Sequence, residues 1–113
     1  TTLRASFSAS HNNWGAMLFD TERRDAYFAP MRSGNYRPYE IKAIVDRVGG
    51  GDSFAAALIY ALTTPELSEP RTAVDFATAA SCLAHSVRGD FNLSSRKEIE
   101  ALMGGSGSGR VQR

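Results

Sequence analysis

The sequence has little cysteine, little net charge and no long apolar run. Its single cysteine, Cys82, excludes an internal disulfide and a cysteine metal site, and it fits a reducing cytoplasm. The net charge of +1 predicts no nucleic-acid partner. No apolar stretch approaches the length of a membrane span, and no signal peptide is visible. With 42% hydrophobic residues, the composition is typical of one soluble globular domain, and we expect a cytoplasmic protein without a membrane or nucleic-acid partner.

The chain is organised around three consecutive glycines, Gly49, Gly50 and Gly51. Residues 39–45, before them, have the β-branched character of a short strand, and residues 53–62, after them, carry apolar side chains at helical spacing. Glycine has no Cβ, so such a loop can take positive φ and let a ligand approach the backbone. The first N–H groups of the helix and its dipole favour an anion there. The pattern predicts a phosphate site between a strand and a helix.

The residue after the glycines, Asp52, puts a carboxylate beside this anion site. A Walker loop would have Lys and then Ser or Thr after its last glycine, whereas Asp52 and Ser53 stand here, so this is no P-loop. A glycine loop that stabilises a transferring phosphoryl group, with a carboxylate that takes a proton from the attacking hydroxyl, would form a compact phosphoryl-transfer site. The alternative is that Asp52 only caps the helix.

These residues resemble a known family. Residues 46–54, Asp-Arg-Val-Gly-Gly-Gly-Asp-Ser-Phe, look like the C-terminal signature of the ribokinase-like (PfkB) carbohydrate kinases. Residues 45–52, together with Thr-Leu-Arg at 2–4 and Gly-Asp-Phe-Asn-Leu at 89–93, are similar to the bacterial 2-keto-3-deoxygluconate kinases within it. The resemblance covers nearly the whole chain.

The resemblance implies an α/β fold, the C-terminal portion of a ribokinase-like α/β/α sandwich with a β-hairpin edge followed by helices. We expect this domain over residues 1–103 and a flexible Gly/Ser-rich tail over residues 104–113. The chain opens inside a predicted strand, which a domain rarely does, and the resemblance implies an N-terminal part of the same fold, with its lid and most sugar contacts, as a partner. Homo-oligomers are also compatible with the sequence.

Alternating apolar residues predict short strands before the glycines. Arg32 and Arg37 stand in a loop rich in helix and strand breakers, and a solvated loop is favoured over a phosphate contact. The expected strands are residues 1–7, 14–19, 26–29 and 39–45, with turns at 8–13 and 20–24 and a loop at 30–38.

Three helices are expected, over residues 53–62, 70–88 and 95–103. The last begins with the capping-box pair Ser95 and Glu98. Within the second, Cys82 and His85 are interpreted as a core thiol and a satisfied histidine, with the border of an adenine pocket as the alternative. Trp14 is expected to be a packing residue and His11 a turn residue.

The resemblance also implies roles for site residues. ATP with Mg²⁺ is the expected phosphoryl donor, bound over Gly49, Gly50 and Gly51, and Asp52 is the expected catalytic base, in contact with the sugar hydroxyl. No protein metal site is expected.

Further contacts follow from the same resemblance. Asp90 is the expected contact to the sugar acid 2-keto-3-deoxygluconate, and Arg4 and Ser6 are expected near the nucleotide phosphates. Asp46 is the candidate for a monovalent cation such as K⁺. Two alternatives stay open: a kinase for another sugar such as ribose or fructose, or an inactive nucleotide-binding or structural half that works only with an N-terminal chain.

Overall fold

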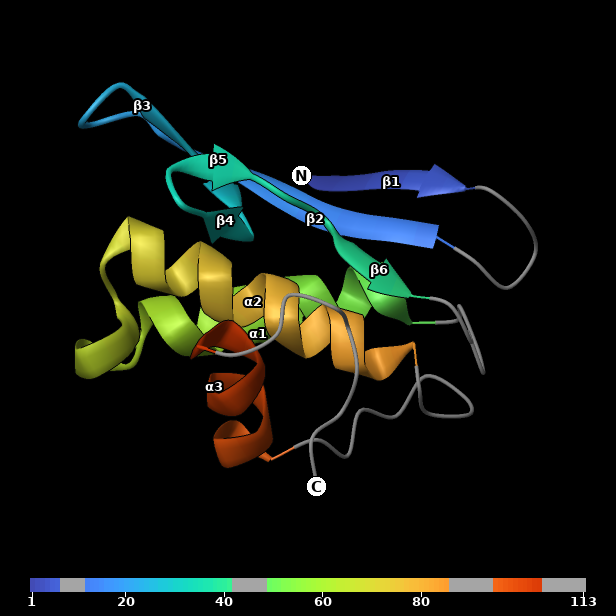
Figure 1. The fold of residues 1–113 in the computed structure, drawn as a ribbon. Helices are drawn as coiled ribbons and strands as arrows, with labels where there is room; N and C mark the ends of the chain where they lie inside the picture. Colours follow the sequence, from blue (N-terminus) through green and yellow to red (C-terminus); the bar gives the residue numbers. More distant parts are fainter. Residues whose placement is uncertain (7–11, 42–48, 86–94, 105–113) are drawn as a thin grey trace.

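The computed structural model describes residues 1–6, 12–41, 49–85 and 95–104, which form a β-sheet with helices on one face (Figure 1). The strands are β1 (Thr2–Ser6), β2 (Asn12–Asp20), β3 (Asp25–Ala29), β4 (Met31–Arg32), β5 (Asn35–Tyr36) and β6 (Tyr39–Ile41). The helices are α1 (Gly50–Leu62), α2 (Pro70–Ala84) and α3 (Arg96–Gly104), with a 3₁₀ turn at Pro65–Leu67. The α/β class and the order of strands followed by helices are confirmed.

The long strand β2 is the centre of the sheet, and all its pairings are antiparallel. β1 covers one edge. The other edge is shared by β3, which pairs with residues 16–20 of β2, and by β6, which pairs with residues 12–14. The chain therefore leaves this edge after Ala29 and returns to it at Tyr39. The small β4–β5 hairpin lies in the segment between β3 and β6.

The two faces of β2 have different neighbours because successive side chains point to opposite sides. Trp14 and Ala16 are buried on the inner face, toward the helices. Gly15 therefore faces outward, and the Tyr36 ring of β5 covers it: a Cβ at Gly15 would overlap the Tyr36 hydroxyl oxygen. Glycine at this position lets the β4–β5 hairpin lie directly on the outer face of the sheet.

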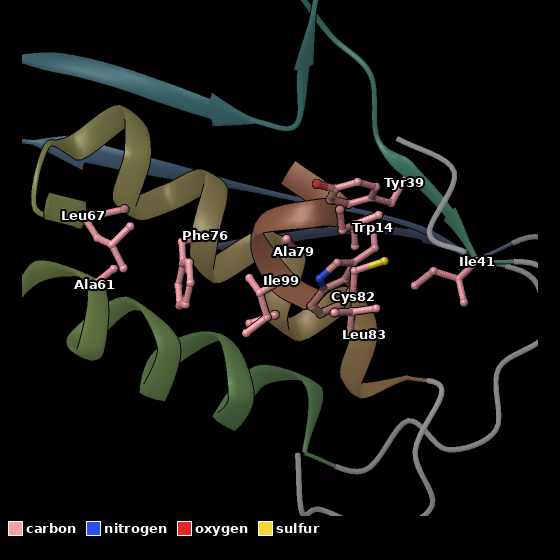
Figure 2. Packing of buried hydrophobic residues seen from close by; sticks show 13 residues of the cluster. Trp14, Tyr39, Ile41, Ala61, Leu67, Phe76, Ala79, Cys82, Leu83 and Ile99 are labelled. Carbon is pink, nitrogen blue, oxygen red and sulfur yellow. The ribbon is translucent and has the colours of Figure 1, made fainter. Parts of the chain in front are cut away.

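Helix α2 is the centre of the helical layer and packs against α1, α3, β2 and β3. Every residue from 76 to 85 is buried, so this part of α2 is covered on all sides. Small side chains such as Ala79, Ala80 and Ser81 allow neighbours to approach α2 from several sides, so it has no broad solvent face here. Figure 2 shows Trp14, Phe76 and Ile99 from three different elements converging on this core.

The structure corrects several predicted boundaries. β2 begins at Asn12, where a turn was expected, because Asn12 and Asn13 pair with both β1 and β6. The predicted loop at 30–38 contains the β4–β5 hairpin, whose turn residues Ser33 and Gly34 have φ of 51° and 81°, as a two-residue turn with positive φ requires. Helix α1 begins three residues before the predicted position.

Other boundaries are confirmed or fall partly outside the described residues. The expected strand 39–45 is described only as β6. Helix α2 ends at Ala84 with His85 as its C-cap, and the expected continuation to residue 88 lies outside the described part. The capping box of α3 is confirmed: the Glu98 N–H donates to Ser95 Oγ at 3.2 Å, and the Ser95 N–H donates to Glu98 Oε1 at 3.4 Å.

Candidate functional site at the start of helix α1

The start of α1 is formed by the three glycines. Gly49 is the N-cap residue, in the left-handed conformation with φ 86° and ψ 2°, and the N–H of Ser53 donates the first helical hydrogen bond to the Gly49 carbonyl at 2.7 Å. Gly50 and Gly51 are thus in the first helical turn, where a loop was expected. The N–H groups of Gly50, Gly51 and Asp52 have no acceptor within the helix, and the helix dipole adds partial positive charge at this end. The geometry suits an anion.

Two of these residues are open to a ligand. Gly51 is exposed, and a Cβ built on it would meet no atom within 4 Å. Asp52 is exposed as well, and within the described part of the chain its carboxylate has neither a hydrogen-bond nor an ion-pair partner. In this structure Asp52 is therefore not used as a helix cap. Its carboxylate is available to a bound molecule beside the free amides.

Gly50, in contrast, is buried against two aromatic rings. A Cβ at Gly50 would lie 3.2 Å from His85 Cε1, 3.4 Å from His85 Nε2 and 3.7 Å from Trp14 Cη2. The two rings also contact each other edge to face, with centroids 4.6 Å apart. The first turn of α1 consequently sits on a platform made by β2 and the C-terminal end of α2. Only a residue without a side chain fits there without displacing a ring.

Hydrogen bonds hold this platform in place. Trp14 Nε1–H donates to Ser81 Oγ at 2.8 Å, and the Ser81 hydroxyl donates to the Thr78 carbonyl at 3.0 Å. His85 Nδ1 lies 2.8 Å from the Ser81 carbonyl oxygen. A carbonyl oxygen only accepts, so Nδ1 carries the proton and the ring turns its Nε2 side toward Gly50. All four side chains are buried, which makes each of these bonds costly to break.

Cys82 lies next to this network in the core and is free. Burial raises the pKa of its thiol to about 12, so it stays protonated at neutral pH. The interpretation of Cys82 as an inert core thiol agrees with this environment. His85 and Trp14 are buried as expected, but their contact with Gly50 was not foreseen, because nothing in the sequence places residues 14, 50 and 85 together.

The remaining predicted site residues lie in different places. Arg4 is exposed on β1 and is the cross-strand partner of Trp14, so the two side chains share the inner face of the sheet, on which Gly50 lies. Ser6 ends β1. Asp46 and Asp90 lie outside the described residues, as does His11.

Metal sites and membrane helices were also sought. The described ranges contain no group of three or more His, Cys, Asp or Glu side chains placed to hold a metal ion. Among the helices of the same residues, none is long and apolar enough to cross a membrane.

Comparisons with solved structures give clear matches. The 2-dehydro-3-deoxygluconokinase of Thermotoga maritima is 44% identical, with a TM-score of 0.76 over 92% of this chain and 28% of that one. A PfkB family carbohydrate kinase of Listeria grayi is 34% identical, with a TM-score of 0.77 over 90% of this chain and 28% of that one. A putative 2-keto-3-deoxygluconate kinase of Enterococcus faecalis is 26% identical, with a TM-score of 0.67 over 90% and 26% of the two chains. The chain thus spans little more than a quarter of these kinases.

Comparison with curated protein sequences gives no match. The pattern of the pfkB family carbohydrate kinases, however, matches residues 20–97, which begin at the last residue of β2 and include β3, β4, β5, β6, α1 and α2. The glycines and Asp52 at the start of α1 fall within this match. The chain belongs to the pfkB family of carbohydrate kinases.

Proposed function

We propose that this chain supplies the anion hole and the catalytic base of a kinase that transfers phosphate from ATP to the terminal hydroxyl of 2-keto-3-deoxygluconate. The observation that carries the proposal is the first turn of α1. The amides of Gly50, Gly51 and Asp52, which have no acceptor within the helix, lie there beside an exposed carboxylate. The substrate is supported by the resemblance of residues 45–52 and by the names of two matched structures, which are a 2-dehydro-3-deoxygluconokinase and a putative 2-keto-3-deoxygluconate kinase.

Each part of the site has a physical task in this mechanism. Bound ATP with Mg²⁺ supplies the phosphoryl group and neutralises part of its charge. The amides at the start of α1 stabilise negative charge that grows on the transferred group, and one donor of this kind is typically worth about 3–4 kcal/mol in the barrier. Asp52 accepts the proton of the attacking hydroxyl. Gly50, held on the rings of His85 and Trp14, fixes the position of these amides.

Other residues are assigned by the family resemblance. Arg4 lies on the same face of the sheet as the platform, and we propose it, with Ser6, as a contact to the nucleotide phosphates. By the same resemblance, we propose Asp90 as the contact to the sugar acid and Asp46 as the candidate for a monovalent cation such as K⁺.

The exposed apolar residues of α1 favour a second candidate function, in which the chain works only together with a partner. The outer side of α1 exposes three large apolar residues, Ile59 (64% exposed), Tyr60 (45%) and Leu62 (46%). An exposed apolar helix face is a common mark of an interface. We propose that this face packs against a further part of a ribokinase-like fold, which also provides most contacts to the sugar. The chain would then be active only together with that partner.

A chimera tests the proposed reaction. This chain replaces the matched segment of the Thermotoga maritima 2-dehydro-3-deoxygluconokinase, and ADP formation is followed with 2-keto-3-deoxygluconate, ribose or fructose as acceptor. We expect turnover that depends on the keto-deoxy acid. A chimera that unfolds cooperatively like the parent enzyme but forms no ADP would contradict a catalytic role. Because the parent enzyme supplies the remaining sugar contacts, turnover mainly with ribose or fructose would show that the contacts from this chain do not suit the keto-deoxy acid.

A further inference from the structure

The outer face of the sheet carries a groove that the kinase site does not use. It is centred on Asn13, Tyr36 and Pro38, which line two adjoining cavities of about 870 and 480 Å³. Asn13 pairs with Glu40 across the β2–β6 ladder and alternates with the inward-facing Trp14, so both point away from the helices. The start of α1 packs against Trp14 on the opposite face. A ligand in this groove is therefore separated from the glycines by the sheet.

The larger cavity is cationic and polar. Arg32 and Arg37 line it together with Glu40, and neither arginine is ion-paired within the ranges that the structure describes. Other lining residues, Ser33 and Asn35, offer hydroxyl and amide groups. Unpaired guanidinium groups beside small polar side chains are suited to phosphate, which they bind through charge-assisted hydrogen bonds.

The arginines are held by an ordered element. Arg32 pairs with Asn35 in the β4–β5 ladder, and the N–H of Arg37 donates to the Pro30 carbonyl at 3.0 Å. Tyr36, between them in the hairpin, is fixed on Gly15. The backbone that carries both guanidinium groups is thus positioned before any ligand arrives, which lowers the entropic cost of binding.

The smaller cavity is lined by residues 2–5 of β1 and continues from Tyr36 and Pro38. Leu3 and Ala5 pair with Gly15 and Asn13, so their side chains face the same outer side. The groove therefore joins a cationic end to a more apolar end.

We propose that this groove is a second anion site, which binds a small organic phosphate with its phosphoryl group at Arg32 and Arg37 and its carbon part toward Leu3 and Ala5. Glu40 opposes the charge of the ligand and limits its affinity. The site is separate from the proposed catalytic centre, and its occupation does not depend on kinase activity.

Titration of the whole chain by two-dimensional amide NMR tests the site, with inorganic phosphate and phenyl phosphate as probes at constant ionic strength. The backbone amides of Asn13, Asn35 and Glu40 should shift saturably, and phenyl phosphate should bind more tightly than inorganic phosphate because it also covers the apolar end. In the double variant R32Q/R37Q, affinity read at these amides should fall about tenfold or more. E40Q should raise it.

The controls separate this groove from the start of α1. Lys97→Gln removes one exposed positive charge on α3, away from the groove, and should leave the affinity within about twofold, as expected for a distant screened charge. Shifts of residues 50–53 report anion binding at the glycines, and these should persist in R32Q/R37Q. The proposal is overturned if the probes shift only residues 50–53, if the double variant binds like the unmodified chain, or if K97Q weakens binding as much as R32Q/R37Q.

Discussion

Gly50 and His85 are in direct packing contact: a Cβ at Gly50 would lie 3.2 Å from His85 Cε1. This single contact joins the first turn of α1 to the end of α2. Through Trp14, which touches both residues, it also joins them to the central strand β2. The position of the proposed anion hole is therefore set by packing in the core beneath it.

Alanine at Gly50 should destabilise the fold, whereas alanine at Gly51 should not. Gly50→Ala forces the His85 ring to move and should lower the free energy of unfolding by about 1–3 kcal/mol, as overpacking does. Gly51→Ala meets open space within a helix and should be neutral or stabilising by up to about 1 kcal/mol. Urea denaturation of both variants measures the difference.

A third variant makes this prediction specific to the His85 contact. In the background of His85→Ala, the space beside residue 50 is open. Gly50→Ala should therefore lower the free energy of unfolding by at least about 1 kcal/mol less in this background than in the unmodified chain. Equal costs in the two backgrounds would show that the ring does not restrict residue 50.

The hydrogen bond between Trp14 and Ser81 should behave as a coupled pair. Trp14→Phe removes the donor and Ser81→Ala removes the acceptor at 2.8 Å. Each change should destabilise the fold by about 1–3 kcal/mol, because it leaves a buried polar group without its partner or removes packing. The double variant should lose clearly less free energy of unfolding than the sum of the losses in the two single variants. Additive costs in a double-mutant cycle would contradict the coupling.

Cys82 should make the fold less stable at alkaline pH. Burial raises the pKa of its thiol from 9.0 to about 12, so above pH 9 the unfolded chain loses this proton while the folded chain keeps it. The unfolded state then binds fewer protons, and the free energy of unfolding falls as pH rises from 9 to 12, by up to about 1.4 kcal/mol per pH unit.

Cys82→Ala provides the comparison for this pH dependence. Its free energy of unfolding should decline less steeply above pH 9 than that of the unmodified chain. Burial also raises the pKa of Tyr39, and the charge of the Cys82 thiolate raises it further, so the part of this contribution that depends on Cys82 is lost in the variant and adds to the difference between the two proteins. Parallel curves from pH 8 to 11, measured by denaturation at each pH, would be inconsistent with a buried thiol.

Gly15 and Tyr36 should be coupled on the outer face. Gly15→Ala places a Cβ against the hydroxyl end of the Tyr36 side chain and should destabilise the chain by about 1–3 kcal/mol. Tyr36→Ala should rescue it, whereas Tyr36→Phe should not, because Tyr36 Cε1 and Cζ also lie only 2.7 Å from the added atom. Rescue by phenylalanine would mean that only the hydroxyl matters.

Much of this fold could be predicted from local sequence patterns. The alternation in β1, the end of α1 at Leu62 and the capping box at Ser95 and Glu98 each depend on a few neighbouring residues, and all are present in the structure. The start of α1 was predicted three residues too late, because glycine has a low helix propensity and a helical turn made of glycines is therefore not expected from the sequence. Here the contact of Gly50 with His85 and Trp14 favours the helical turn.

The candidate site could be predicted only in part, because some of its residues are far apart in the sequence. The glycines and Asp52 are adjacent in the sequence, so their chemistry was visible. The platform beneath them comes from β2 and α2, and the outer groove depends on a hairpin in a predicted loop. Such contacts between distant residues leave no local pattern.

The most direct test of the proposed function is the turnover of Asp52→Asn in the chimera with the Thermotoga maritima kinase. The variant should keep the affinity for ATP, because the amides of α1 remain, and lose most of kcat, because no carboxylate accepts the hydroxyl proton. Removal of a general base typically costs about 10²–10⁴-fold in rate. Asp25→Asn, an exposed carboxylate in β3, serves as the matched control and should retain kcat. Near-normal turnover of the Asp52→Asn chimera would contradict the assignment of Asp52 as the catalytic base.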